Sequence, residues 1–489
     1  MQHLEMSMMK EKSAHRADPK FKHKLAANKD GDSLKFCYQC GACTSVCPIS
    51  KFIDIYRPNK IIELCKLGIR NLPQSNAFLF CSACTLCTKG CPQNVSVHGV
   101  MQAMKELSKD DADTMEFLKK GFEQTLESLG NEIPLPLVYS WICLRPQDEE
   151  ADDIFSAEIR KSLKKALDRP YTEAPPLKPD AKRIAIIGSG PSGLTAAWDL
   201  ARAGFSVTVF ESLPELGGML RTGIPEYRLP KELLDSEIDR IKAVGVKMKT
   251  NEAVDEEFFE NLVDGDKFEA VFIATGAFKS RKLGVEGEDL QDVVSAIEFL
   301  KEYNLAGGAK TGKKVVVIGG GNVATDAAGA ALRCGAKSVR LFCLEDKKSM
   351  PAHEWEIEEI AADGIEINPS WGVKSIVGNG QTVSGVIFKR CISVFDKNGR
   401  FAPVFDEESI KEIEADMVIS AIGQYPDLSF LCGGIDSARG AVRADPYTME
   451  TNIPGIYAGG DAVSGTASLV EAITDGKTAA KSIIRYLSD

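Results

Sequence analysis

The sequence lacks any apolar run approaching the roughly 18 residues that a membrane-spanning helix needs. Its N-terminal region also lacks the apolar core of a secretory signal, and it carries Glu5, Glu11 and Asp18, which transit peptides avoid. We therefore expect a cytoplasmic protein without a membrane span. Residues 1–30 are polar and charged, and we expect them to form a flexible tail.

An excess of basic residues is also missing. The 489 residues include 59 Lys and Arg against 70 Asp and Glu, which gives a formal net charge of −11 at pH 7. No long stretch is dominated by lysine or arginine. Because nucleic acids attract cationic surfaces, this charge balance excludes nucleic acid as an expected partner.

Cysteine, in contrast, is abundant. Eight of the 14 cysteines fall in two runs with the same C-x2-C-x2-C-x3-C-P spacing, namely Cys37, Cys40, Cys43 and Cys47, and Cys81, Cys84, Cys87 and Cys91. This spacing is wrong for paired disulfides and matches the ferredoxin pattern for [4Fe–4S] clusters. Zinc is the alternative, since CxxC pairs also form zinc sites, but zinc takes four ligands in two pairs. Two identical four-cysteine runs fit two clusters better.

The fourth cysteine of each run is expected to bind the other cluster, as in two-cluster ferredoxin domains. The predicted ligands are therefore Cys37, Cys40, Cys43 and Cys91 for one cluster, and Cys81, Cys84, Cys87 and Cys47 for the other.

Three regions follow one another along the chain. Residues 31–110 hold both cysteine runs and an amphipathic stretch that predicts a short helix, so we expect a mainly α-helical, ferredoxin-like domain. Residues 111–181 predict a helical connector that ends in a proline-rich linker. From residue 182 onward, short β-branched runs alternate with helical patterns, which is typical of an α/β fold with parallel sheets.

The first glycine-rich turn follows the strand-like run RIAII and opens a predicted helix. It consists of Gly188, Gly190, Pro191, Ser192 and Gly193. Glycines at these positions permit a tight turn and let a pyrophosphate approach the helix N-terminus. Glu211 ends the next predicted strand, where a carboxylate accepts hydrogen bonds from ribose hydroxyls.

A second turn of the same kind follows VVVI. It consists of Gly319, Gly321, Asn322, Val323 and Ala324, with alanine as an allowed third small residue. The strand after it ends near Glu345. The sequence therefore predicts two dinucleotide-binding units of Rossmann type.

The C-terminal segment GIYAGGDAVSGTASLVEAI resembles the flavin motif of flavoproteins with two dinucleotide domains. The resemblance implies that Asp461, after Gly460, meets the ribityl chain, and that the helix beginning at Ser468 faces the flavin ring. It also implies nested domains. Residues 182–288 plus 424–489 would bind FAD, and residues 289–423 would form an inserted NAD(P)-binding domain.

The stretch GGMLRTGIPEYRLP resembles the small subunit of glutamate synthase and its relatives, which include the N-terminal part of dihydropyrimidine dehydrogenase and the large subunit of the bifurcating transhydrogenase. The similarity runs from about residue 182 to 489 and includes GGGNVATDAA and MPAHEWEIEE. It implies that Gly217, Gly218 and Arg228 lie near FAD, and that Ala421 and Gly423 lie near the nicotinamide. Residues 31–110 resemble the C subunit of heterodisulfide reductase.

Two features depart from the glutamate synthase pattern. The family's own cysteine-rich segment before the flavin domain is reduced to Cys143, and the ferredoxin-like module takes its place. Many relatives also have arginines, which hold the 2′-phosphate of NADP, where this chain has Leu344 and Glu345. A carboxylate there repels that phosphate, so NAD(H) is favoured, with NADP(H) still possible through Lys347 and Lys348.

The expected function is electron transfer between a nicotinamide dinucleotide, FAD and two [4Fe–4S] clusters. Hydride transfer to a flavin requires no protein acid or base, so we assign no catalytic residue. We expect a subunit of a larger redox complex, with electron bifurcation as one form of it, whose N-terminal domain passes electrons to other redox subunits or to ferredoxin. The alternatives are a stand-alone NAD(P)H:ferredoxin-type oxidoreductase and an electron donor like the glutamate synthase small subunit.

Overall fold

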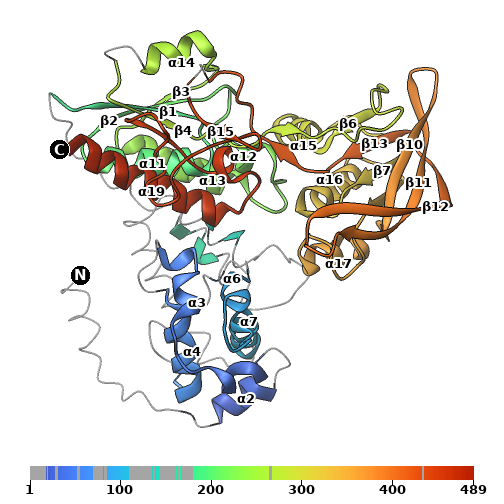
Figure 1. The fold of residues 1–489 in the computed structure, drawn as a ribbon, viewed down its shortest axis with the longest axis horizontal. Coiled ribbons are helices and arrows are strands. Elements are labelled where there is room, and N and C mark those ends of the chain that lie inside the picture. The colour runs from blue at the N-terminus through green and yellow to red at the C-terminus, as the bar shows by residue number, and fades with distance from the viewer. Residues whose placement is uncertain are drawn as a thin grey trace. The chain divides into compact units, whose positions relative to one another are not determined.

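The computed structural model divides into two compact units, residues 1–172 and 173–489 (Figure 1). The residues that it describes are 18, 20–27, 31–51, 56–69, 81, 85–108, 135, 138–139, 141–142, 161–163, 165–166, 180–263, 267–431 and 434–488. The predicted cluster ligand Cys84 and most of the predicted helical connector, residues 111–181, lie outside them.

The regular elements of the N-terminal unit are all helices among its described residues. Its elements are α2 (Phe21–Ala27), η1 (Asp32–Phe36), α3 (Ala42–Ser45), η2 (Ile49–Lys51), α4 (Pro58–Leu67), α6 (Leu86–Lys89) and α7 (Val97–Ser108). The predicted amphipathic helix is confirmed as α4. It begins at a proline, whose missing N–H costs nothing in the first turn, and ends at Gly68 in a left-handed conformation.

The predicted flexible tail is wrong at its C-terminal end, because α2 lies within residues 1–30. Phe21 and Leu25 are one helical turn apart and both are buried. Helix α2 packs against α4 and α7, and the backbone N–H of Asp18 donates to the carbonyl of Gly68 over 2.9 Å. Burial of one apolar face therefore orders this short segment despite its many lysines.

The first sheet of the second unit is entirely parallel, in the order β17-β4-β1-β2-β3. Its strands are β1 (Arg183–Ile187), β2 (Ser206–Phe210), β3 (Lys247–Lys249), β4 (Ala270–Ile273) and β17 (Ile456–Ala458). The helices of this half are α11 (Pro191–Arg202), α12 (Met219–Thr222), α13 (Lys231–Ala243), α14 (Glu256–Val263), α18 (Asp461–Ser464) and α19 (Leu469–Ser488). Helices α11 and α19 lie side by side (Figure 1).

The second parallel sheet has the order β6-β13-β7-β8-β9. Its strands are β6 (Val293–Ser295), β7 (Lys314–Ile318), β8 (Ser338–Cys343), β9 (Glu366–Pro369) and β13 (Met417–Ser420), with helices α15 (Ala296–Ala306), α16 (Asn322–Arg333) and α17 (Glu354–Ala362). An antiparallel sheet adds β10 (Trp371–Asn379), β11 (Thr382–Phe395) and β12 (Phe401–Glu414).

The order of the strands shows that the second sheet is inserted into the first. Strand β17 follows the whole second sheet in sequence, yet it pairs with β4 of the first sheet. The chain leaves and returns through β5 (Lys279–Ser280) and β14 (Gln424–Tyr425), which pair antiparallel. A small pair, β15 (Ser437–Ala438) and β16 (Ala441–Val442), completes the fold. The predicted α/β class with two nested dinucleotide-binding units is confirmed.

Among the described residues, no helix combines the length and the apolar character that crossing a bilayer requires.

Candidate cluster and dinucleotide sites

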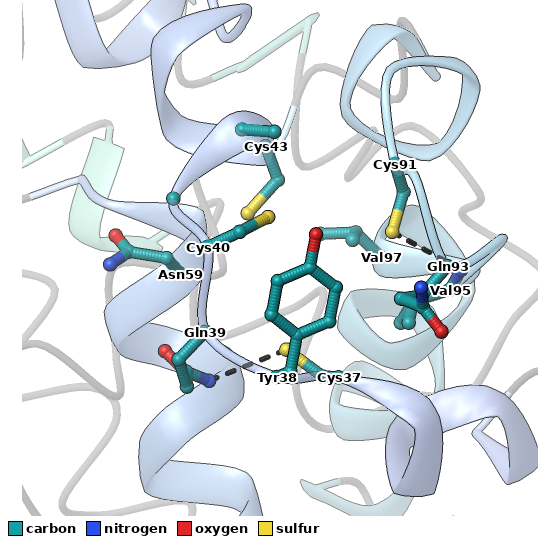
Figure 2. Close-up of a pocket in the computed structure, with 12 residues that line it drawn as sticks. Cys37, Tyr38, Gln39, Cys40, Cys43, Asn59, Cys91, Gln93, Val95 and Val97 are labelled. Carbon is teal, nitrogen blue, oxygen red and sulfur yellow. Dashed lines mark hydrogen bonds between the residues drawn. The ribbon is translucent and has the colours of Figure 1, made fainter.

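A small pocket brings together cysteines from both runs (Figure 2). Three of them, Cys37, Cys40 and Cys43, belong to the first run, and Cys91 belongs to the second. The pocket is completed by Tyr38, Gln39, Gly41, Ala42, Asn59, Gln93, Val95 and Val97. The four cysteines are those that the sequence predicts as ligands of one cluster.

Local backbone geometry wraps the first run around this pocket. Gln39 and Gly41 have φ angles of 64° and 82°, and these left-handed conformations turn the chain between Cys37 and Cys43. Two donors point at sulfur atoms: Gln39 Nε2 lies 3.4 Å from Cys37 Sγ, and the backbone N–H of Val95 lies 3.3 Å from Cys91 Sγ. Such N–H···S hydrogen bonds are among the interactions that tune iron–sulfur clusters.

The chemistry of the donor set fits a cluster. Burial and the neighbouring Cys37 thiol raise the pKa of Cys43 to about 11, so the Cys43 thiolate needs a compensating cation. Iron supplies that charge when a cluster binds. Among the described residues, no three His, Cys, Asp or Glu side chains form a ready-made group for one metal ion.

The second predicted ligand set is buried, as far as the structure describes it. Cys47, Cys81 and Cys87 each expose less than a tenth of their surface. Tyr56 is fully enclosed, and burial together with the charges of Cys81 and Cys47 raises its pKa above the ordinary value. One buried hydroxyl therefore faces thiols from both runs. His98 adds a ring nitrogen, Nδ1, 3.8 Å from Cys81 Sγ.

Tyr38, Tyr56 and His98 belong to no sequence motif that predicts a role in a cluster site. A hydrogen bond with Cys40 raises the pKa of the exposed Tyr38, and Figure 2 shows the Tyr38 ring among the pocket cysteines. Single aromatic and histidine residues carry no spacing signal. Adjacency to a cysteine run is the one hint that the sequence offers, and it applies to Tyr38 alone.

The first glycine-rich turn has the shape that a dinucleotide requires. Gly188 has a φ of 103°, and a Cβ atom there would lie 2.4 Å from the carbonyl oxygen of Ala274. A Cβ on Gly193 would lie 2.1 Å from the carbonyl oxygen of Gly188. Gly190, in contrast, has open space around its Cα and precedes α11, which begins at Pro191 without a side-chain cap. The helix N-terminus is therefore open to an anion.

Unpartnered buried hydroxyls lie beside this turn. Ser192 Oγ and Thr275 Oγ1 are buried and have no hydrogen-bond partner, and the Cα of Thr275 would lie 3.1 Å from a Cβ on Gly188. Buried hydroxyls are normally hydrogen-bonded, so these two fit a bound polar ligand such as the phosphates and sugar of a dinucleotide.

Glu211 lies at the end of β2, as predicted. Its Oε2 accepts from the backbone N–H and the hydroxyl of Ser189 over 3.0 and 2.6 Å, and its Oε1 accepts from the backbone N–H of Leu213 over 2.9 Å. The backbone N–H of Gly217 also donates to Ser189 Oγ. A Cβ on Gly218 would lie 2.8 Å from Gly190 Cα, so the Gly217–Gly218 pair packs directly on the turn.

The C-terminal motif returns to the same turn. A Cβ on Gly460 would lie 3.0 Å from Ser192 Cβ, and the backbone N–H of Gly460 donates to Asp475 Oδ2 over 3.0 Å. Burial raises the pKa of Asp461 to about 6. Ser468 Oγ accepts from the backbone N–H of Glu471 at the start of α19. Gly460 of the C-terminal motif therefore packs on the N-terminal turn of α11.

The second turn repeats this geometry in the inserted unit. A Cβ on Gly319 would lie 2.3 Å from the carbonyl oxygen of Ala421, while Gly321 is open and precedes α16, which starts at Asn322. Val323 is partly buried against the core, and Ala324 is fully buried, which permits close packing of helix on sheet. The backbone N–H of Arg281 donates to the carbonyl oxygen of Gly423 over 3.0 Å.

Glu345 reaches the second turn from the end of β8. A Cβ on Gly320 would lie 3.0 Å from Glu345 Oε2, so the carboxylate lies beside the glycines. This is where a ribose-binding carboxylate is expected in a dinucleotide fold. Arg228, for which the resemblance implies a place near FAD, contacts Asp326 of α16 and Glu359 of α17.

Comparison with known proteins assigns families to both units. The pyridine nucleotide-disulphide oxidoreductase family matches residues 182–476, and a 4Fe-4S dicluster domain matches residues 36–96. Among solved structures, FprA of Mycobacterium tuberculosis in complex with NADPH shares the fold. Its TM-score is 0.55 with 20% identity, and the match covers 63% of this chain and 85% of that chain.

Three curated relatives differ in how much of this chain they match. The β subunit of the NADP(+)-dependent formate dehydrogenase of Moorella thermoacetica is 41% identical over 63% of this chain, and the match spans only 44% of that subunit. The β subunit of the NADPH-Fe(3+) oxidoreductase of Geobacter sulfurreducens is 31% identical over 94% of this chain and 71% of its own length. The glutamate synthase [NADPH] small chain of Escherichia coli is 33% identical over 64% of this chain and 70% of its own length.

The family match covers more than half of the chain and includes both glycine turns and the C-terminal motif described above. The dicluster match coincides with the cysteine pocket. The chain therefore belongs to the pyridine nucleotide-disulphide oxidoreductase family and carries an N-terminal 4Fe-4S dicluster domain.

Proposed function

We propose that this protein is an NAD(P)H-dependent oxidoreductase that passes electrons between a nicotinamide dinucleotide, FAD and two [4Fe–4S] clusters, as a cytoplasmic subunit of a larger redox complex. The observation that carries this proposal is the pocket in which Cys91 of the second run joins three cysteines of the first. A chain with two open dinucleotide turns and such a pocket has both an entry and an exit for electrons.

The residues of the flavin half bind and orient. The N-terminus of α11, opened by Gly190, binds the pyrophosphate of FAD, and Glu211 accepts from its ribose. Asp461 and the start of α19 at Ser468 complete the site. When bound, FAD supplies the chemistry that accepts an electron pair and releases single electrons.

The residues of the inserted half bind the nicotinamide dinucleotide. Gly319, Gly321 and the N-terminus of α16 hold its pyrophosphate, with Ala421 and Gly423 beside the nicotinamide. Positioning of the two rings is what the protein contributes, so no acid or base of the chain takes part.

The dinucleotide that we favour is NAD(H). The curated relatives named above carry NADP or NADPH in their names. In this chain, however, Glu345 points a carboxylate at the glycine turn. A second negative group at that position repels a 2′-phosphate and accepts from a free 2′-hydroxyl. Lys347 and Lys348 follow closely in sequence, so NADP(H) remains the alternative.

For the clusters, we propose Cys37, Cys40, Cys43 and Cys91 as one ligand set, and Cys47, Cys81, Cys84 and Cys87 as the other. Electrons leave through this domain to other redox subunits or to a ferredoxin. Two of the relatives are named as β subunits of redox enzymes, which supports a subunit role, with electron bifurcation as one form of it. A stand-alone NAD(P)H:ferredoxin-type oxidoreductase is the alternative.

Anaerobic purification of the native protein tests this proposal. We expect one FAD and about eight iron atoms per chain, loss of flavin absorbance on addition of NADH or NADPH, and co-purifying redox subunits. Stoichiometric zinc with little iron would contradict the cluster assignment. Purification as a single chain that reduces ferredoxin would favour the alternative.

A further inference from the structure

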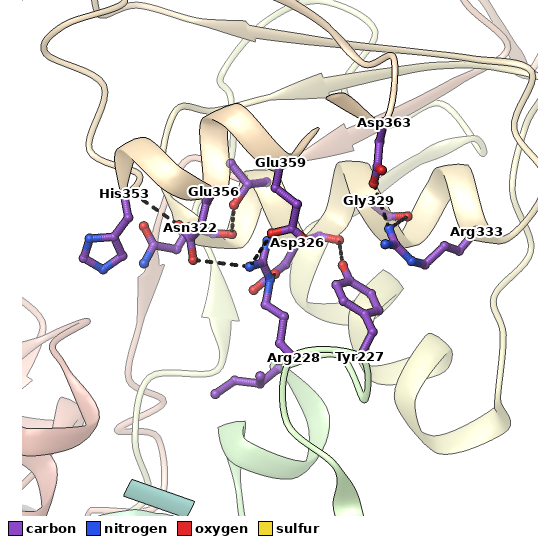
Figure 3. Close-up of polar contacts among 12 residues, drawn as sticks. Tyr227, Arg228, Asn322, Asp326, Gly329, Arg333, His353, Glu356, Glu359 and Asp363 are labelled. Carbon is purple, nitrogen blue, oxygen red and sulfur yellow. Dashed lines mark hydrogen bonds and ion pairs between the residues drawn. The ribbon is translucent and has the colours of Figure 1, made fainter. Parts of the chain in front are cut away.

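Three sequence motifs that lie far apart along the chain meet at one buried cluster of charges (Figure 3). The strap, which we define as residues 217–231 of the flavin half, contributes Tyr227 and Arg228. The second glycine turn continues into α16 and contributes Asp326, and the segment MPAHEWEIEE contributes Glu356 and Glu359 of α17.

Arg228 is the cation that joins these elements. Its Nε forms an ion pair with Asp326 Oδ1, and its Nη1 lies 3.0 Å from Glu359 Oε2 and 3.9 Å from Glu356 Oε1. The side chain of Arg228 is only 7% exposed. The planar guanidinium therefore holds α16 and α17 at once from a segment outside the inserted unit.

We call the ion pairs of Arg228 with Asp326 and Glu359 the fork. Aromatic side chains also contact the residues of the fork. The guanidinium of Arg228 lies 5.0 Å from the centre of the Trp355 ring, and Tyr227 Oη lies 3.3 Å from the carbonyl oxygen of Asp326 as its donor. The guanidinium of Arg333 on α16 lies 4.0 Å from the centre of the Tyr227 ring. Cation–π contacts of this kind restrict the orientation of the guanidinium plane.

The strap links the two dinucleotide turns directly. At one end, Gly218 packs on Gly190 of the flavin turn. At the other end, Arg228 forms an ion pair with Asp326. Asp326 lies one helical turn after Asn322, on the same face of α16. Arg228 therefore contacts the helix whose N-terminus is open for the second dinucleotide.

Stability alone does not account for this cluster. One arginine faces three carboxylates, and removing charges from water costs several kcal/mol per ion in order-of-magnitude terms. An apolar contact of the same volume would hold the helices at lower cost. A charge cluster of defined geometry, in contrast, selects one orientation of the helices.

We propose that Arg228 is a positioning residue: its fork to Asp326 and Glu359 sets the orientation of the inserted unit, and thereby the placement of the nicotinamide over the flavin. The inference rests on the proposed hydride transfer. Displacement of the reacting rings by about 1 Å is enough to slow such a step strongly.

The test compares Arg228→Lys with Arg340→Lys in the full-length protein loaded with FAD. Lysine keeps the buried charge but lacks the fork. Arg340 is the matched control, because it forms an exposed 3.0 Å ion pair with Glu366 in the same unit. For Arg228→Lys we expect flavin reduction at saturating dinucleotide to slow by about tenfold or more, with KM and FAD content unchanged within about twofold. Arg340→Lys should match the wild type.

Wild-type flavin reduction in Arg228→Lys would overturn the proposal, and so would loss of FAD, because Arg228 would then be a flavin-binding residue. If Arg228→Lys does not fold, Asp326→Asn decides by the same criteria. Hydrogen exchange of α16 and α17 gives a readout without turnover, and we expect faster exchange in Arg228→Lys only. If neither NADH nor NADPH reduces the wild type, the proposed function fails, and hydrogen exchange still tests the fork.

Discussion

At the scale of single residues, the two carboxylates Glu211 and Glu345 have comparable places but different surroundings. Each follows a second strand and lies at a glycine turn. Glu211 already accepts hydrogen bonds from Ser189, Ser212 and Leu213, which fix the orientation of its carboxylate. Glu345 touches Gly320 and so stands where an adenosine ribose would be recognised.

Glu345→Arg should move the preference of the enzyme from NADH toward NADPH. An arginine attracts the 2′-phosphate that the carboxylate repels. We expect the ratio of kcat/KM for the two dinucleotides to change by about tenfold or more, which is about 1.4 kcal/mol. Glu412→Arg, an equal change of charge at an exposed position of β12, should leave the ratio unchanged. A wild type that prefers NADPH by tenfold would refute our assignment of Glu345.

Glu356 makes the stability of the second unit depend on pH. Burial and the neighbouring Asp326 raise the pKa of Glu356 to about 7, against about 4.3 in an unfolded chain. Arg228 lowers that pKa and Glu359 raises it, by smaller amounts. Because the folded state holds the proton more tightly, this contribution is complete below about pH 4 and is lost as the pH rises to about 7.

Glu356→Gln removes that titration. The loss of stability between about pH 5 and pH 8 should be smaller than in the wild type, by on the order of 1–2 kcal/mol. Thermal unfolding across this range measures the difference, with the exposed Glu366→Gln as the control. Parallel profiles for Glu356→Gln and the wild type would show that Glu356 is ionised throughout.

At the scale of elements, the sequence predicted those turns, strands and helices whose conformation depends on neighbouring residues in the chain. The glycine turns, the strands that precede them and the helix α4 follow from short-range spacing, because φ angles and helix caps depend on neighbours in sequence. Tyr56 beside Cys81, and Arg228 on Asp326, arise from packing between distant segments. No periodicity encodes such contacts. The same holds for α2, whose burial against α4 and α7 overrides its polar composition.

The two cysteine runs make a paired prediction at this scale. Cys91 shares a pocket with Cys37, Cys40 and Cys43, so Cys91→Ser should damage the cluster of the first run and spare the other. Cys47→Ser should do the reverse. Electron paramagnetic resonance of the two reduced variants, each serving as the control for the other, distinguishes the clusters. Loss of the first run's cluster in Cys47→Ser would exclude the exchange of fourth ligands.

At the scale of the whole molecule, residues 173–489 form a compact unit of their own. A truncated chain that starts near Pro179 contains both glycine turns and the C-terminal motif. We expect it to bind FAD and to be reduced by the dinucleotide within about twofold of the full-length rate, because these sites lie wholly within the unit.

The same truncated chain should fail to reduce the native protein acceptor, since the cluster domain is absent. Full-length protein with Cys91→Ser is the companion variant, because it keeps the domain and alters one cluster. Acceptor reduction at the full-length rate by the truncated chain would mean that electrons leave from FAD directly. The clusters would then serve another branch or a structural role.

The pairing of β5 with β14 has a consequence for how such a protein is assembled. The chain enters the inserted unit at Lys279–Ser280 and leaves it at Gln424–Tyr425, and these two short strands are hydrogen-bonded neighbours. Because both ends of the insert meet at one place, the parent sheet closes through β17 whatever lies between them. The inserted unit should therefore be exchangeable. Replacing all residues between these two strands with a related domain would give a chimaera with a new dinucleotide preference, while the flavin sheet stays undisturbed.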